Sequence, residues 1–446
     1  MRRHLTNAVY GVIDYASYPI GMLLVAPIVL HRIGASEYGL WMVSTAVVST
    51  GGIIASGFCD ANIQRVARFR GTGQIQPMVH TVRSQFAINL VLGSILAALT
   101  WAFAPYAAQH IAVSRMVSTA ECLTALRIAS LLILVRAVET VAVSTQRAFE
   151  EYRSSVQISA AVRLLTLASA AVLAFFAQRT VSILAATAVV MMLGTLLQFQ
   201  QARHLLGGAS LWPAFEPEAT RALLKFGAFV WFQALGGVIF TQFDRILLGV
   251  SLGAQAVAPY ALCVQFAQPI TGVTASGLSF LFPYLSKNAE TLSPKTLRHT
   301  LYKAVAANLA GVGCCAGALL LVGHRLLRIW AGVAIAESAV KILPLVVLGS
   351  ALMGISATGI YALQALGQFR IVSIISLGSR AALLPVMVYL LHKMGLEGLA
   401  ISRVCLGSVA LLVYLPLWKF IAPRTGASQS SAAPEASFAL QEGPHL

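Results

Sequence analysis

The sequence A-F-E-E-Y-R-S-S-V-Q-I-S-A-A-V-R runs from Ala148 to Arg163, and a related stretch, A-L-G-Q-F-R-I-V-S-I-I-S-L-G-S-R, runs from Ala365 to Arg380. A shift of 217 positions places Ala148, Arg153, Ser159 and Arg163 on identical residues and Tyr152 on Phe369. Each copy carries one Arg at the start of an apolar run and a second Arg ten residues further along. The chain therefore repeats an Arg at the same depth of two apolar segments.

A second match has nearly the same spacing. With a shift of 219, Gly34-Ala35 falls on Gly253-Ala254 and Trp41 falls on Tyr260. Two matches at one spacing in a chain of 446 residues indicate two halves with a common plan.

The composition around these stretches is that of a membrane protein. Hydrophobic residues make up 58% of the chain and charged residues 10%, whereas a soluble domain has about 25% charged residues. The apolar residues form runs of about twenty, the length that a helix needs to cross ~30 Å of hydrocarbon. We predict an all-α integral membrane protein of about twelve spans, at 8–30, 38–59, 82–104, 121–142, 156–177, 180–201, 226–248, 255–283, 300–322, 338–362, 371–391 and 396–418.

Six spans in each half define the expected domains. Residues 1–207 form an N-terminal six-helix bundle and residues 226–418 a C-terminal one. The even number of spans makes the two copies parallel, related by an axis along the membrane normal. Pro217 starts a short amphipathic helix at the membrane interface within a cytoplasmic linker, 208–225. The Ser- and Ala-rich tail, 419–446, is expected to be disordered.

The charge distribution predicts the orientation. The net charge is +16, and cytoplasmic loops of membrane proteins are rich in Lys and Arg. With the N-terminus inside, eighteen Lys and Arg residues lie on the inner side and eight on the outer side. Both termini are therefore expected on the cytoplasmic side of the membrane. No basic patch with interleaved aromatic residues suggests a nucleic-acid partner, and the six Cys lack the spacing of a metal or disulfide framework.

Arginines within the apolar runs are the first candidates for function. An Arg near mid-helix costs ~2.5–3.5 kcal/mol on insertion scales, so such residues face a bundle interior or a wet cavity. A guanidinium stays ionised and binds phosphate oxygens in pairs. Alternatives are an Arg that reaches the interface, for the residues nearest a span end, and an ion pair with Glu139 for Arg136. The candidate substrate-binding cations are Arg136, Arg163, Arg380, Arg127 and Arg403.

Acidic residues within spans are candidates for ion coupling. Asp14 precedes Pro19 and Pro27, each of which removes a backbone hydrogen bond from the first span. A carboxylate beside freed carbonyls can hold a proton or a cation, although Asp14 can also be an interfacial residue. Glu139 is the second candidate. For Asp244, a local pair with Arg245 or a solvated helix end is preferred to a gate.

No pattern predicts catalysis. The chain has no P-loop for an internal ATP-driven motor, no metal-binding pattern and no large outer loop with paired carboxylates. We therefore expect neither an enzyme nor a cofactor.

Four motifs in chain order resemble those of Wzx-like polysaccharide flippases, of the multidrug/oligosaccharidyl-lipid/polysaccharide superfamily. They are a turn between the first two spans, a segment ending in Arg, a motif joining spans seven and eight, and a loop between spans ten and eleven. Their residues are Leu30-His-Arg-Ile-Gly-Ala-Ser-Glu-Tyr-Gly-Leu-Trp41, Gly57-Phe-Cys-Asp-Ala-Asn-Ile-Gln-Arg65, Asp244-Arg-Ile-Leu-Leu-Gly249 with Leu252-Gly253 and Tyr260, and Ala362-Leu-Gln-Ala-Leu-Gly-Gln-Phe-Arg370. One departure is Ala258-Pro259, where the family more often has Gly before the Tyr.

The resemblance implies two six-helix bundles around a central cavity that opens alternately to the two sides of the membrane. It also implies a substrate, an undecaprenyl-pyrophosphate-linked oligosaccharide destined for O-antigen, capsule or exopolysaccharide. Polysaccharide polymerase and glycosyltransferases are then possible partners. Three alternatives stay open: a small-molecule exporter of the same superfamily, a membrane glycosyltransferase or polymerase, and a non-transporting scaffold.

Overall fold

The structure is a computed structural model that describes residues 2–55, 57–112, 117–149, 152–176, 179–278, 294–366 and 368–421. Within these ranges the side chains of some residues are not described, among them 2–17 and 232–241. All described secondary structure is helical. Most of the tail predicted to be disordered, 422–446, lies outside the described residues.

The helices of the first half are long and connected by short turns. In chain order they are α1 (Arg2–Ala55), α2 (Cys59–Gly71), α3 (Ile75–Ile111), α4 (Thr119–Ala148), α5 (Tyr152–Phe176) and α6 (Thr180–Leu205). The second half contains α7 (Pro217–Leu252), α8 (Ala254–Leu278), α10 (Pro294–Ala331), α11 (Val333–Ala339), α12 (Ile342–Ala365), α13 (Phe369–Ala410), a 3₁₀ turn at Leu411–Val413 and α14 (Tyr414–Ile421).

Two glycines divide the longest helices. Gly34 in α1 and Gly395 in α13 have φ angles of 83° and 58°, a left-handed conformation that glycine adopts without steric cost. Among the described residues, seven helices are long and apolar enough to cross a membrane. Counting both arms of α1 and α13 with α3, α4, α5, α6, α7, α8, α10 and α12, the described chain contains the twelve long segments expected. The predicted all-α membrane fold is confirmed.

The repeat seen in the sequence is also a repeat of local structure. α4 ends at Ala148 and α12 at Ala365, 217 positions apart. Gly34 and Gly253, which the second match aligns, have the same backbone angles, φ 83° and ψ 168°. Both matches therefore mark equivalent helix boundaries in the two halves.

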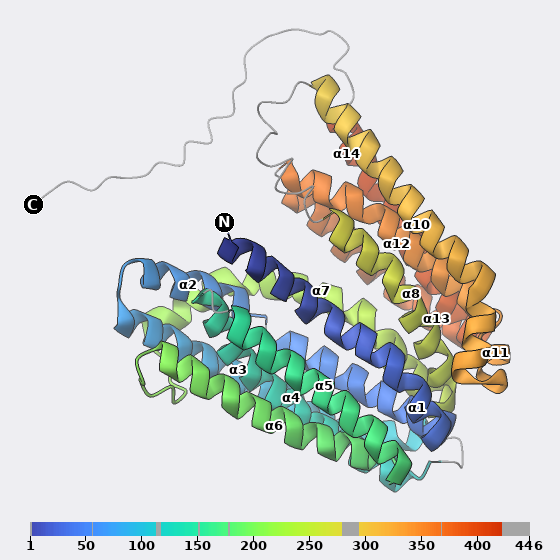
Figure 1. Cartoon of the computed structure of the whole chain (residues 1–446), viewed down its shortest axis with the longest axis horizontal. Coiled ribbons are helices and arrows are strands. Elements are labelled where there is room, and N and C mark those ends of the chain that lie inside the picture. Colours follow the sequence, from blue (N-terminus) through green and yellow to red (C-terminus); the bar gives the residue numbers. More distant parts are fainter. Residues whose placement is uncertain are drawn as a thin grey trace, which may run out of the picture.

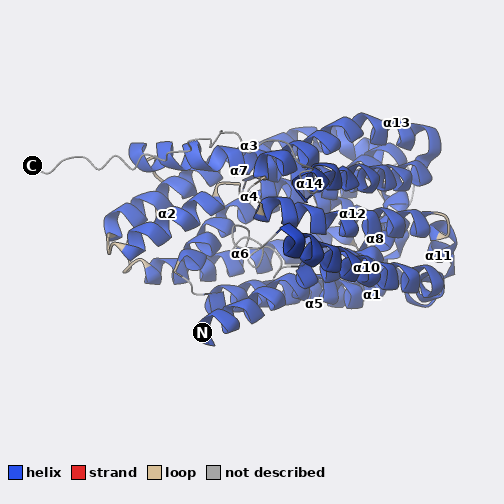
Figure 2. Cartoon of the chain, turned by 90° about the horizontal axis from the view of Figure 1, so that it is seen from above, coloured by secondary structure: helices blue, strands red, loops and turns tan. Residues whose placement is uncertain are grey.

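The helices form two lobes that meet at one end (Figure 1). Helices α1 to α6 form the first lobe, and α8, α10, α12 and α13 form the second. The lobes approach each other near α11 and diverge toward α2 and α14. A view at right angles shows the same helices packed side by side along the length of the molecule (Figure 2). At the converging end Gly39 allows close contact, because a Cβ there would lie 1.7 Å from the Ala254 carbonyl oxygen.

α7 connects the lobes. It begins at Pro217 and continues without interruption to Leu252, so the stretch expected as a separate interfacial helix forms its first turns. Near the diverging end, the Trp231 indole donates to the Ile54 carbonyl of α1 over 2.6 Å. Further along α7, Asp244 accepts a hydrogen bond from Tyr260 of α8 over 2.7 Å. One helix is thus attached to both lobes.

The short helix α2 was not predicted from the sequence. Its 13 residues are too few and too polar to span a membrane. The buried Asn62 attaches α2 to α4 by donating to Ser144 Oγ over 2.9 Å.

Candidate functional site

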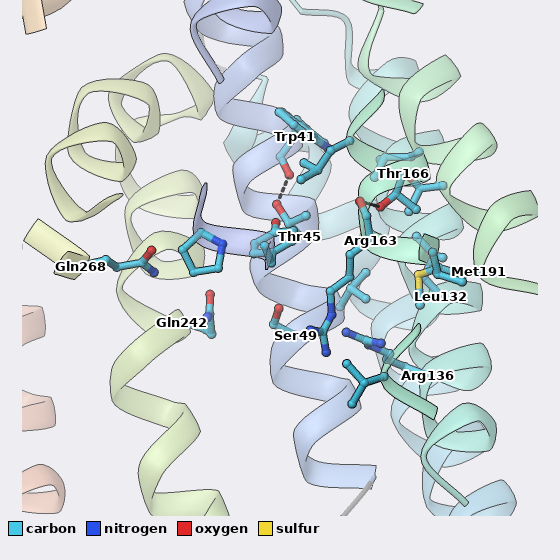
Figure 3. A pocket seen from close by; sticks show the side chains of 18 of the residues that line it. Trp41, Thr45, Ser49, Leu132, Arg136, Arg163, Thr166, Met191, Gln242 and Gln268 are labelled. Carbon is cyan, nitrogen blue, oxygen red and sulfur yellow. Dashed lines mark hydrogen bonds between the residues drawn. The ribbon is translucent and has the colours of Figure 1, made fainter. Parts of the chain in front are cut away.

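A cavity of about 740 Å³ lies in the first lobe and faces the second. Helices α1, α4, α5 and α6 supply most of its wall, while α7 and α8 each supply one glutamine, Gln242 and Gln268 (Figure 3). Its size lies within the range of ligand-binding pockets, roughly 300–1,000 Å³.

One face of α1 runs along the middle of the cavity. Trp41, Thr45 and Ser49 recur at intervals of four residues, so they share that face. Gly52 lies one turn beyond Ser49. A Cβ at Gly52 would lie 2.9 Å from Arg136 Cγ, so the glycine leaves room for the stem of the arginine.

Three arginines line the cavity wall on α4 and α5. Arg136 and Arg147 are eleven residues apart on α4, about three helical turns, so both are on one face and separated by about 17 Å along the axis. Arg163 comes from α5, and Figure 3 shows its guanidinium group directed toward that of Arg136. None of the described residues that line this cavity is Asp or Glu. The wall is therefore strongly cationic.

A second chamber of about 280 Å³ extends the cavity toward α2 and shares all three arginines with it. Its wall adds the carboxylates of Asp60 and Glu139. Glu139 Oε2 lies 2.7 Å from Arg136 Nη1, and the exposed fractions of the two side chains are 5% and 38%. The sequence allowed two interpretations of Arg136, a cavity-facing cation and a partner of Glu139. The structure shows both, because Arg136 pairs with Glu139 and also faces the cavity.

Buried amide groups hold the helices behind the arginines in register. Gln146, which precedes Arg147, donates to the side chain and backbone of Gln198 on α6. Gln198 in turn donates to Ser159 Oγ on α5 over 3.1 Å. These hydrogen bonds join α4, α5 and α6 where Arg147 and Arg163 enter the cavity.

The other predicted arginines lie elsewhere. Arg127 packs over the ring of Trp101, with its Cζ 4.7 Å from the ring centroid, and its buried Nε has no hydrogen-bond partner within the described part of the chain. Arg380 is half-buried on α13 and is not on the cavity wall. Arg403 Nη1 lies 3.9 Å from Asp244 Oδ2, and Arg403 Cζ lies 5.9 Å from the centroid of the Tyr260 ring.

The expectation for Asp244 was wrong. Its side chain is only 3% exposed, so it is not a solvated helix end, and it interacts with Tyr260 and Arg403 on other helices. The Arg245 contact is made by its backbone N–H, which donates to Asp244 Oδ1. The side chain of Asp14 lies outside the described residues.

Arg147, Gln242 and Gln268 are among the cavity residues that sequence reasoning missed. Arg147 was assigned to a loop, although its spacing of eleven from Arg136 places both on one face if the helix continues. Gln268 lies 219 positions after Ser49, so the repeat could have found it. No signal in the sequence distinguished Gln242. Within the described ranges, no cluster of His, Cys, Asp and Glu could hold a metal ion.

Comparisons with known proteins agree with this architecture. Residues 7–289 match the family described as "Polysaccharide biosynthesis protein". No curated protein sequence matches the chain significantly.

Solved structures of transporters share the fold. The lipid II flippase MurJ in an inward closed conformation is 14% identical, with a TM-score of 0.71, over 92% of this chain and 87% of MurJ. An inward-facing multidrug resistance MATE transporter of the MOP superfamily is 13% identical, with a TM-score of 0.68, over 92% of this chain and 98% of its own. The MATE multidrug transporter DinF-BH is 15% identical, with a TM-score of 0.62, over 94% and 95%.

Proposed function

Because this chain belongs to the polysaccharide biosynthesis protein family, we propose that it is a flippase for a polyprenyl-pyrophosphate-linked oligosaccharide. It moves this lipid from the inner to the outer leaflet of a bacterial inner membrane, for O-antigen, capsule or exopolysaccharide. The observation that carries the proposal is the set of three arginines, Arg136, Arg147 and Arg163, that line both the cavity and the chamber beside it.

The chemistry of the wall fits a pyrophosphate. Guanidinium groups donate paired hydrogen bonds to phosphate oxygens and remain ionised in a membrane protein. An anion in the cavity would lie among three guanidinium groups, one of which, that of Arg136, also pairs with Glu139. The electrostatic attraction is also larger in the low-dielectric interior than in water. A polyprenyl chain can remain in the lipid between the lobes while its head group occupies the cavity.

Alternating access supplies the transport step. The lobes meet at the end that contains Gly39 and Ala254 and diverge at the end that contains α2 (Figure 1). The chamber beside α2 extends the cavity toward the diverging end. Closure at that end and opening at the other would expose the same arginines to the opposite side of the membrane.

The orientation follows from the excess of Lys and Arg on one side. With both termini in the cytoplasm, the diverging end faces the compartment in which lipid-linked sugars are assembled. Glycosyltransferases then act before transport and a polysaccharide polymerase after it. Glu139 and Asp14 remain the candidates for coupling to a cation gradient.

The experiment compares arginines within and outside the cavity. R147Q, R163Q and the matched control R127Q are expressed at equal levels in cells that lack the native protein, and surface polysaccharide is measured. We expect R147Q and R163Q to reduce export at least about 10-fold, with lipid-linked oligosaccharide accumulating in the inner leaflet, because each change removes a charged hydrogen bond of roughly 1.5–3 kcal/mol. R127Q should retain export within about 2-fold.

Equal export by all three variants would contradict the proposal. A small-molecule exporter is the second candidate, since MATE transporters share the fold. In that case polysaccharide would be unchanged and resistance to an anionic drug would fall. An enzyme or a scaffold would show no accumulation of complete lipid-linked oligosaccharide.

A further inference from the structure

The cavity has two chemically different walls. Arg136 and Arg163 lie on the side formed by α4 and α5, whereas Gln242 and Gln268 lie on the side formed by α7 and α8 (Figure 3). The α1 face that carries Thr45 and Ser49 runs between them. One wall is thus cationic, and the other is polar but uncharged.

The two glutamines present side-chain amides to the cavity. Among the described residues, neither side-chain amide makes a hydrogen bond. Gln268 is exposed although it lies within the apolar helix α8, between Ala267, which is buried, and Pro269. Its amide is accessible from the cavity, so it can hydrogen-bond to a polar group that is bound there.

The two walls select different chemical groups. A phosphate offers only acceptors at neutral pH, so it pairs best with the guanidinium groups. A carboxamide both donates and accepts, which matches sugar hydroxyl and acetamido groups that also do both. A carboxylate placed against the glutamines would gain no charge pairing there.

We propose that Gln242 and Gln268 bind the sugar next to the pyrophosphate, and that this sugar is uncharged. The proposal rests on the proposed function, because the arginine wall must hold the pyrophosphate for the sugar to reach the opposite wall. Gln242 and Gln268 are specificity-determining residues, whereas the arginines bind every polyprenyl pyrophosphate.

The test measures equilibrium binding to the full-length protein in lipid nanodiscs. Three probes are used: undecaprenyl pyrophosphate alone, the same lipid carrying N-acetylglucosamine, and the same lipid carrying glucuronic acid. The variants are Q242L, Q268L, their combination, R163Q and the control Q76L, which changes an exposed glutamine of α3 away from the cavity. Leu retains most of the side-chain volume, so the changes mainly remove hydrogen bonds.

We expect Q242L and Q268L each to weaken binding of the N-acetylglucosamine lipid about 3- to 10-fold, and the combination about 10- to 100-fold. Binding of the bare lipid should change less than about 2-fold, and R163Q should weaken all three probes. The wild type should bind the N-acetylglucosamine lipid more tightly than the glucuronic acid lipid.

Equal effects of the glutamine variants on sugar-bearing and bare lipid, or no effect on either, would overturn the inference while R163Q could still support the proposed function. If the wild type binds the glucuronic acid lipid more tightly, only the claim that the sugar is uncharged is overturned. If the wild type binds none of the probes, the proposed function fails and the inference fails with it.

Discussion

The guanidinium group of Arg136 pairs with Glu139 and also faces the cavity. Removing Arg136 alone leaves a carboxylate that is 5% exposed without its charged partner. We expect R136Q to lower the midpoint of thermal unfolding in detergent by several degrees. R136Q/E139Q should recover most of that loss, because breaking one member of a buried pair costs more than replacing both.

Transport separates the two roles of Arg136. If the guanidinium also binds the cargo, R136Q/E139Q exports less than E139Q, which lacks the same carboxylate but keeps the guanidinium. Full export by the stable double variant would show that Arg136 only neutralises Glu139. An unchanged midpoint for R136Q would show that the pair does not stabilise the fold.

At the residue scale, the ion pair of Arg136 with Glu139, one of two interpretations of the sequence, is present in the structure. The i, i+3 spacing of Arg136 and Glu139 is sufficient to predict their ion pair. The contacts of Arg403 and Asp244 depend on helices 159 positions apart in the sequence, so no local pattern reports them. Arg127 stacks on Trp101 of the neighbouring helix, which also requires knowledge of helix packing.

At the scale of elements, Pro27 in α1 explains a contact between the lobes. Proline has no N–H, so the carbonyl of Leu23, four residues earlier, lacks its helical partner. The indole of Trp330, at the end of α10, donates to that carbonyl over 2.9 Å. Separation of the lobes at this end would leave the Leu23 carbonyl without a partner, so the hydrogen bond favours the closed arrangement.

A double-mutant cycle tests this contact. We expect W330F to destabilise the protein by about 1–3 kcal/mol, because it leaves a partly buried acceptor unpaired. In the background of P27A, whose N–H can bind the Leu23 carbonyl, W330F should cost much less. Chemical unfolding in detergent measures the free energy of unfolding of the wild type, of each single variant and of the double variant. The control is W212F, a change at a highly exposed Trp.

Additive effects in the cycle would contradict this role for Trp330. A coupling energy of about 0.5–3 kcal/mol is expected for residues that share one hydrogen-bonding group.

Apolar runs of about twenty residues were sufficient to locate the long helices. Short or polar elements gave no such signal, so α2 was missed and the first turns of α7 were expected as a separate helix. Hydrophobic periodicity cannot reveal that α7 contacts both lobes, because that contact depends on Trp231 and Asp244 reaching different partners.

On the scale of the whole molecule, the two halves share an arrangement of helices but supply different side chains to the cavity. The first half supplies all three cavity arginines, while the second supplies the two glutamines. Arg380, the repeat of Arg163, is not on the cavity wall. The repeat therefore marks equivalent helix boundaries in the two halves, but it does not show that the two halves place different side chains on the cavity wall.

The most direct test of the central claim is lipid flipping in reconstituted vesicles. A fluorescent undecaprenyl-pyrophosphate sugar is incorporated with the purified protein, and a membrane-impermeant quencher reports the fraction in the outer leaflet over time. Wild type and R127Q should make nearly all of the lipid accessible, whereas R136Q/R147Q/R163Q should leave the inner-leaflet half protected. Equal flipping by the triple variant and R127Q, or no flipping by the wild type, would contradict the account.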